Sequence, residues 1–181
     1  TCGTDCAPDP SIVLSPGEFL SLGTDPAAIA NAISASDKTF SVDGLGVAMV
    51  FDTVSTAGNV NVDLMDPALV SGATSLGGGK LSMSASGSTI TTTSSVMEIA
   101  LAGTETPSVS GSITLTIPYD EANIPAGVSE SNLKMIHYTG GVWVTESNNC
   151  SVDAVNNKIT CTVTSLSPFA TGAGPASGGG G

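Results

Sequence analysis

Aliphatic side chains alternate with threonine or serine along several short segments, and this period of two is the strongest constraint on the fold. In "SITLTIP", Ile113, Leu115 and Ile117 occupy every second position, and Pro118 ends the segment. The same spacing recurs in "GVAMVFDTV" and in "NVNVDL". Because successive side chains of a β-strand point to opposite faces of a sheet, the pattern predicts strands with one buried face.

Further strand candidates follow one another at short intervals, separated by turns that contain glycine or asparagine. They are "GKLSMSAS", "STITTTSS", "VMEIAL", "NLKMIHY", "GVWVTE" and "CSVDAVNNKITCTV". Only 4% of the residues are aromatic, so the core must be built from aliphatic side chains. We therefore predict an all-β fold, an antiparallel β-sandwich of about nine or ten short strands.

The first 36 residues differ from the rest and predict an N-terminal extension with one short helix. "SIVLSPGEFLSL" indicates one or two short strands, and this segment could act as a donor strand that adds to the sheet of a neighbouring copy. In "TDPAAIANAISAS", Asp25 is a typical N-cap, Pro26 suits the first helical position, and Ile29 and Ile33 are four residues apart. We expect the sandwich to span residues 37–172 and a Gly-rich flexible tail to span 173–181.

The four cysteines form two local pairs, which favours disulfides and an oxidising compartment. "AVNN" predicts a four-residue turn at 154–157, which would place Cys150 opposite Cys161 on one face of a hairpin. Cys2 and Cys6 could close a small ring at the N-terminus, with a metal site as the rival interpretation. We expect a secreted protein at the cell surface, its signal peptide already removed.

The charge balance restricts the partners. Four basic residues stand against sixteen acidic ones, for a net charge of -12. Nucleic acids and anionic membrane surfaces both require clustered Lys and Arg, so we expect neither as a partner. No apolar run is long enough for a bilayer span, so direct membrane insertion is not expected.

The chain's one histidine and one tryptophan lie close together in "NLKMIHYTGGVWV". On a strand, Leu133, Met135 and His137 would share one face, with Trp143 as a cross-strand or near neighbour of His137. No second histidine, GxSxG elbow or HExxH motif accompanies them. We therefore expect a hydrogen-bonded sheet histidine in a protein that is not an enzyme, and keep a hydrolase using His137 as an alternative.

Two groups of acidic residues could carry other chemistry. Asp120, in "YDEAN", follows a strand end and is expected to cap the next turn toward Asn123 or Ile124. "NVNVDLMD" places Asn61, Asp63 and Asp66 close together in sequence as a candidate calcium site. A solvated face is the preferred interpretation of these three residues, and no other cofactor is expected.

Several motifs together resemble a known module. They are the strand before "PYDE", the "IPAG" turn, the "YTGGVW" hairpin and the "VDAVNNKI" hairpin before "SPF". Over residues 40–172 the chain resembles modules of secreted and surface-displayed bacterial proteins, whose C-terminal part is similar to the Zu-five β-sandwich domain. Some relatives self-cleave at a His-Phe-Ser sequence, but here Pro168 precedes Phe169 and no histidine adjoins them, so self-cleavage is not expected.

The resemblance implies a structural or interaction unit without a shared active site. We accordingly expect a non-enzymatic extracellular structural protein, a subunit of a cell-surface or fibre-like assembly. Its partners would be further copies of itself, forming a filament, or other surface proteins. The alternative is an adhesin or glycan-binding module of a larger bacterial surface protein.

Overall fold

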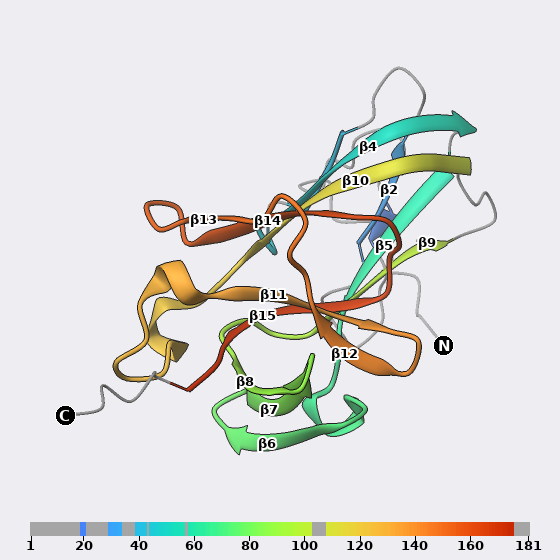
Figure 1. The fold of residues 1–181 in the computed structure, drawn as a ribbon. Helices are drawn as coiled ribbons and strands as arrows, with labels where there is room; N and C mark the ends of the chain where they lie inside the picture. The colour runs from blue at the N-terminus through green and yellow to red at the C-terminus, as the bar shows by residue number, and fades with distance from the viewer. Residues whose placement is uncertain are drawn as a thin grey trace, which may run out of the picture.

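The chain is all-β, as its alternating pattern predicts. The computed structural model describes residues 19–20, 29–33, 39–42, 44–56, 58–102 and 108–175. Within these ranges it contains fifteen β-strands and three short 3-10 helices, and no α-helix. Figure 1 shows β4 and β10 at one end, β6, β7 and β8 at the other, and β11 and β15 between them.

A five-stranded sheet is built around the most regular segment of the sequence. Its order is β13-β14-β10-β4-β3, with antiparallel pairing throughout. Ile113, Leu115 and Ile117 are buried on one face of β10, and the strand ends at Pro118 as predicted. The strand bounds are β3 Thr39–Val42, β4 Val47–Thr56, β10 Ser108–Pro118, β13 Ser151–Asp153 and β14 Lys158–Val163.

A ten-stranded sheet has the order β1-β2-β5-β9-β15-β11-β12-β7-β6, and β8 pairs with both β15 and β7. Its strands are β1 Phe19–Leu20, β2 Ile29–Ile33, β5 Gly58–Leu64, β6 Ala73–Gly77, β7 Lys80–Ala85, β8 Ser88–Thr92, β9 Met97–Ala102, β11 Lys134–Thr139, β12 Val142–Thr145 and β15 Pro168–Ala173. The 3-10 helices are η1 Pro67–Leu69, η2 Glu121–Asn123 and η3 Glu130–Asn132.

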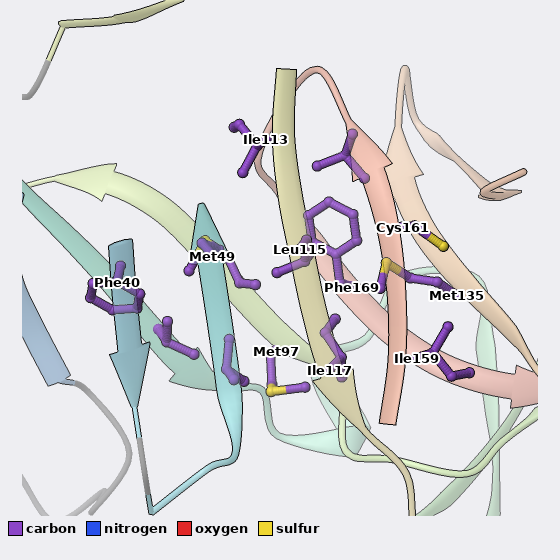
Figure 2. Close-up of a cluster of buried hydrophobic side chains, with 14 of the residues drawn as sticks. Phe40, Met49, Met97, Ile113, Leu115, Ile117, Met135, Ile159, Cys161 and Phe169 are labelled. Atoms are coloured by element: carbon purple, nitrogen blue, oxygen red, sulfur yellow. The ribbon is translucent and has the colours of Figure 1, made fainter. Parts of the chain in front are cut away.

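The main core lies where the two sheets face each other. Figure 2 shows side chains of β10, β4 and β14 meeting those of β11, β15 and β9. Leu115 and Ile117 contribute from the five-stranded sheet, and Met135 and Phe169 contribute from the other, all fully buried. The predicted aliphatic core is therefore present, and its aromatic members are Phe40, Phe51, Tyr119 and Phe169.

Part of the ten-stranded sheet closes into a five-stranded barrel, which the sequence did not predict. β15 pairs with β11, β11 with β12, β12 with β7, β7 with β8, and β8 with β15. A second buried cluster fills this ring, with Ile136, Ala170, Met83 and Trp143 among its members. β11 and β15 thus supply side chains to both cores, because neighbouring residues on a strand point to opposite faces.

The structure differs from the predicted antiparallel sandwich in two further respects, the number of strands and one parallel pairing. The structure has more strands than the nine or ten expected, because segments that were not expected to be strands, such as β2, β3 and β6, also pair with the sheets. The β12–β7 contact is parallel, through the single registered pair Trp143 and Ala85. Closure of the barrel brings these two strands together from separate hairpins, so no local turn could signal the pairing.

The predicted helix in the N-terminal extension is wrong. Ile29–Ile33 forms β2, which pairs antiparallel with β5 along five registered positions from Ile29/Val62 to Ile33/Gly58. Local signals such as a cap and a four-residue spacing are outweighed here by the backbone hydrogen bonds available at the edge of β5. Of the one or two short strands predicted in "SIVLSPGEFLSL", one is present as β1, which pairs with β2, and the rest of that segment lies outside the described residues.

A bulge in β10 depends on glycine. The registers of β10 and β4 shift between Ser110 and Ile113, and Gly111 has φ +83°. A Cβ added at Gly111 would approach the Asp52 Cβ to 2.8 Å. Since both the backbone conformation and the lack of space exclude a side chain, Gly111 is required at this bulge.

Candidate functional site

His137 lies on β11 in the interior of the ten-stranded sheet. It pairs with Val144 of β12 on one side and with Phe169 of β15 on the other. The residue is 3% exposed, and its ring stacks on that of Phe169 with centroids 4.0 Å apart and planes 15° apart. The predicted sheet position of His137 is therefore confirmed, on the face that also carries Met135 and Leu133.

Glu146 is the hydrogen-bonding partner of His137. Its carboxylate oxygen Oε1 lies 2.8 Å from His137 Nδ1, and its side chain is 18% exposed. The Glu146 backbone N–H donates to the Met135 carbonyl oxygen at 2.9 Å, which fixes the residue beside β11. A carboxylate at Nδ1 favours the tautomer that carries its proton there, so that Nε2 is left as an acceptor.

This arrangement contains the acid and the base of a catalytic triad, and no nucleophile among the described residues contacts the base. His137 Nε2 is buried and has no hydrogen-bonding partner among the described residues. A general base must lie within hydrogen-bonding reach of the hydroxyl or water that it deprotonates. As placed, the pair can orient the imidazole and hold β11 against the chain after β12, but it presents no accessible base.

Trp143 was expected as a cross-strand or near neighbour of His137. It lies on the adjacent strand β12, next to the His137 partner Val144, but its own registered partner is Tyr138. These two residues are a registered pair of β11 and β12, with ring centroids 5.3 Å apart. Both contact the barrel core, whereas His137 faces the main core. The difference follows from the tight turn at 140–141, which sets the register of the hairpin.

A cleft of about 460 Å³ lies next to Glu146, between β11 and the β13–β14 hairpin. We call it the hairpin cleft. Leu133, Met135 and Ile159 are among its apolar lining residues, and Glu146 and Lys134 bring opposite charges to it. The remaining lining includes serine and threonine hydroxyls and the Cys150 end of the disulfide. Its mixed lining does not single out a ligand class.

The hairpin disulfide is present as predicted. Cys150 and Cys161 are bonded, with their Cα atoms 4.1 Å apart, and the register of β13 and β14 places them opposite each other. Asp153 stabilises the turn by accepting hydrogen bonds from Asn156 and from the Val155 backbone N–H. The hydrogen bonds from Asn156, above all, lower the pKa of Asp153. Cys2 and Cys6 lie outside the described residues.

The three residues of the candidate calcium site have separate surroundings. Asn61 and Asp63 alternate with the buried Val60 and Val62 on β5, so both are on the face of β5 away from the main core. Asp66 instead caps η1, where its Oδ1 accepts a hydrogen bond from the Ala68 N–H at 2.9 Å. In the described ranges, no group of three or more His, Cys, Asp or Glu side chains could hold a metal ion.

The outer face of β5 is nevertheless unusual in its electrostatics. Glu98 of β9 is the registered partner of Asp63, and burial together with this neighbouring carboxylate raises the pKa of Glu98. The Asn61 Oδ1 atom is buried without a hydrogen-bonding partner among the described residues. Calcium binding by Asn61, Asp63 and Asp66 stays a prediction, with a solvated face as the preferred interpretation, and the structure places Asp66 at η1, apart from the other two residues.

Asp120 has the capping role expected of it. Its side chain accepts hydrogen bonds from the Ala122 N–H at 2.9 Å and from Asn123 Nδ2 at 3.1 Å. Just before it, the buried Tyr119 donates a hydrogen bond to Glu130 Oε2 at 2.9 Å. Burial, and then this carboxylate, raise the pKa of Tyr119 to about 12.

Glu146 is the functional-site residue that sequence reasoning missed. The signal was available, because a hairpin that turns at 140–141 pairs His137 with Val144. Two positions further on, Glu146 must return to the same face as His137 and lie diagonal to it. Counting residues from the turn therefore identifies Glu146 as a neighbour of His137.

Comparison with known proteins adds no relative: no family model matches the chain, and no curated protein matches it. Within the described residues, no helix is both long and apolar enough to cross a membrane.

Proposed function

We propose that the chain is a non-enzymatic, extracellular structural module, a subunit of a cell-surface or fibre-like assembly. In this proposal the two facing sheets act as a β-sandwich scaffold related to the Zu-five-like modules. The disulfide in the hairpin supports an oxidising compartment. The buried His137, without a partner at Nε2 among the described residues, supports a role other than hydrolysis.

The observation that carries the proposal is the position of β2. This strand belongs to the N-terminal extension, and it adds to the sheet at β5 through five registered pairs. Strand addition supplies main-chain hydrogen bonds without requiring a specialised side-chain site. Within one chain, β2 covers the β5 edge, and in an assembly the β2 of a neighbouring copy would take the same place.

Strand exchange of this kind turns an intramolecular contact into a head-to-tail one. Each subunit would offer one donor strand, β2, and one acceptor edge, on β5. A head-to-tail contact that does not close on itself produces a filament. The exposed strand edge that each subunit would otherwise present is then covered by its neighbour.

Deletion of residues 1–33 tests the proposal, since it removes the donor strand and keeps the acceptor edge. Under negative-stain microscopy we expect the oxidised full chain to form filaments or chains of particles, and the deletion variant to stay monomeric. Added in excess to the full chain, the deletion variant should shorten the filaments, because it binds a donor strand and offers none. Trimming residues 176–181 is the matched control and should leave filament length unchanged.

Two results would contradict the proposal. If the full chain remains monomeric at all concentrations, it does not assemble, and the proposal is wrong. A deletion variant that assembles like the full chain would show that β2 is not the connecting strand. Circular dichroism of the deletion variant distinguishes loss of assembly from loss of the fold.

A further inference from the structure

A second cavity lies at the end of the barrel, away from His137. Three tight turns, at 71–72, 86–87 and 140–141, meet there around Tyr138, Val142 and Trp143. We call this cavity the barrel groove. Its volume is about 460 Å³, within the range of roughly 300–1,000 Å³ that small-molecule sites occupy.

None of the residues that line the barrel groove carries a formal charge. They are hydroxyl, glycine, valine and aromatic residues, in a chain whose net charge is -12. A charged ligand would lose its hydration there without gaining a counter-charge, which is unfavourable. A wholly apolar ligand would leave the serine hydroxyls of the lining without water. The lining therefore suits an uncharged ligand that carries hydroxyl groups.

Tyr138 and the exposed edge of Trp143 supply an apolar surface for such a ligand. Trp143 is 5% exposed, and most of its ring packs in the barrel core. Trp143 is held by a hydrogen bond from its Nε1 to the Ser71 carbonyl oxygen at 2.9 Å. Tyr138 is half-buried and donates from its hydroxyl to Ser71 Oγ at 3.3 Å. Both rings are thus fixed by polar contacts to one turn, so little side-chain freedom remains to be lost when a ligand binds.

Glycine keeps the approach to these rings open. A Cβ added at Gly72 would lie 4.0 Å from Trp143 Cδ1 and would meet nothing nearer, and added Cβ atoms at Gly87 and Gly141 would meet nothing within 4 Å. Ser86, in the second turn, has φ +47°, and its Oγ accepts a hydrogen bond from the Thr145 N–H at 2.9 Å. The turns therefore present backbone and hydroxyl groups around the rings without bulky side chains.

We infer that the barrel groove binds a neutral saccharide, with a sugar ring against Tyr138 and the exposed edge of Trp143, and with its hydroxyls toward the serines of the turns. The apolar face of a pyranose matches an aromatic side chain, and its hydroxyls match donors and acceptors at the rim. This inference goes beyond the proposed structural role and does not depend on assembly. It would give a surface module an adhesive contact with glycans.

Trp143 makes the inference directly measurable, because it is the chain's one tryptophan and lines the groove. The full chain is titrated with cellotetraose, maltotetraose, chitotetraose and mannotetraose, and with tetragalacturonate as an anionic control. We expect a saturable change in tryptophan emission, and in the indole N–H resonance, with at least one neutral member and none with the galacturonate. If no neutral member changes either signal, or galacturonate matches them, the inference is wrong.

A matched pair of substitutions locates the binding. Val142 lines the groove and is 59% exposed, and Val155 lies on the cysteine hairpin and is 92% exposed, so lysine is tolerated at both. Val142→Lys should weaken saccharide binding at least about tenfold by placing a charged side chain across the groove. Val155→Lys should leave the affinity unchanged.

If the two lysine variants bind the saccharide with equal affinity, the saccharide does not bind in the barrel groove, and the inference is wrong. The titrations are done at concentrations where the chain is monomeric, or with the deletion variant lacking residues 1–33 once its fold is verified. Microscopy then measures assembly and the titrations measure saccharide binding, so the failure of one is distinguished from the failure of the other.

Discussion

Some residues in this protein fill a core and also place a polar group inside it, and that group needs a hydrogen-bonding partner. Tyr119 does both, since its ring packs in the main core and its hydroxyl reaches Glu130. His137 is similar, with its ring on Phe169 and its Nδ1 on Glu146. In each case a buried ring is hydrogen-bonded to a carboxylate. Removing the carboxylate would leave a buried polar atom of the ring without a partner, which lowers the stability of the fold.

The Tyr119 hydroxyl gives a prediction about alkaline pH. Because the folded pKa is about 12 and the ordinary value is 10.0, the folded state holds this proton more tightly than the unfolded chain does. The corresponding stability is complete below pH 10 and is lost as the pH rises from 10 toward 12. Tyr119→Phe cannot ionise, so it escapes this loss.

We therefore expect Tyr119→Phe to be less stable than the original chain by about 1 kcal/mol at pH 8, through the lost hydrogen bond. At pH 11 the difference should shrink, because only the original chain is losing stability there. Denaturant unfolding of both proteins at the two pH values measures this. A difference that stays constant between pH 8 and pH 11 would show that Tyr119 does not titrate as inferred.

At the scale of elements, the hairpin of β13 and β14 is the part of the fold that its own sequence specifies most completely. The turn, the alternation and the cysteine spacing all agree on one register, and that register is present. The bond closes a loop between residues 11 apart in sequence. Its main effect is expected on the unfolded chain, whose freedom it restricts.

Replacing both cysteines, Cys150→Ala with Cys161→Ala, should lower the free energy of unfolding by about 3 kcal/mol. Part of this loss would come from Cys161, which is fully buried in the main core. Urea unfolding of the double variant measures the change, and Cys161→Ala in a reduced chain serves as the control for packing alone. A double variant as stable as the oxidised chain would show that the hairpin contributes no restraint.

Other elements could not be predicted in the same way. β4, β5 and β10 follow from alternation, because one face of each is buried in the main core. β11 and β15 are buried on both faces, so period two says nothing about which core each residue enters. β2 carries helical signals and becomes a strand only because β5 offers an edge 25 or more residues later in sequence.

At the candidate sites, the sequence predicted the roles of single residues better than it predicted which residues lie next to each other. It placed His137 on a strand and Asp120 at a cap, both of which the structure confirms. It described Trp143 only as a cross-strand or near neighbour of His137, without finding its partner Tyr138, and it missed Glu146, since both depend on the register of one hairpin. The barrel groove depends on three turns that are far apart in sequence, two of them in separate hairpins and one before β6, and no local pattern brings them together.

At the scale of the whole molecule, two cores share one pair of strands. Met135 faces the main core and Ile136, the next residue on β11, faces the barrel core, and both are fully buried. Phe169 and Ala170 divide in the same way on β15. Neither core can open without disturbing β11 and β15, so we expect the described fold to unfold as one cooperative unit.

The shared strands make this cooperativity testable with two adjacent substitutions. Met135→Ala and Ile136→Ala should each lower stability by roughly 2–5 kcal/mol, because each leaves a cavity in a closed core. Trp143 belongs to the barrel core, so its fluorescence reports that core, while far-ultraviolet circular dichroism reports all strands. If the cores are coupled, Met135→Ala shifts the Trp143 midpoint as far as it shifts the dichroism midpoint, although it removes no atom from the barrel. If instead the Trp143 transition stays in place while the dichroism separates into two steps, the barrel folds independently, and the chain is two units joined along β11 and β15.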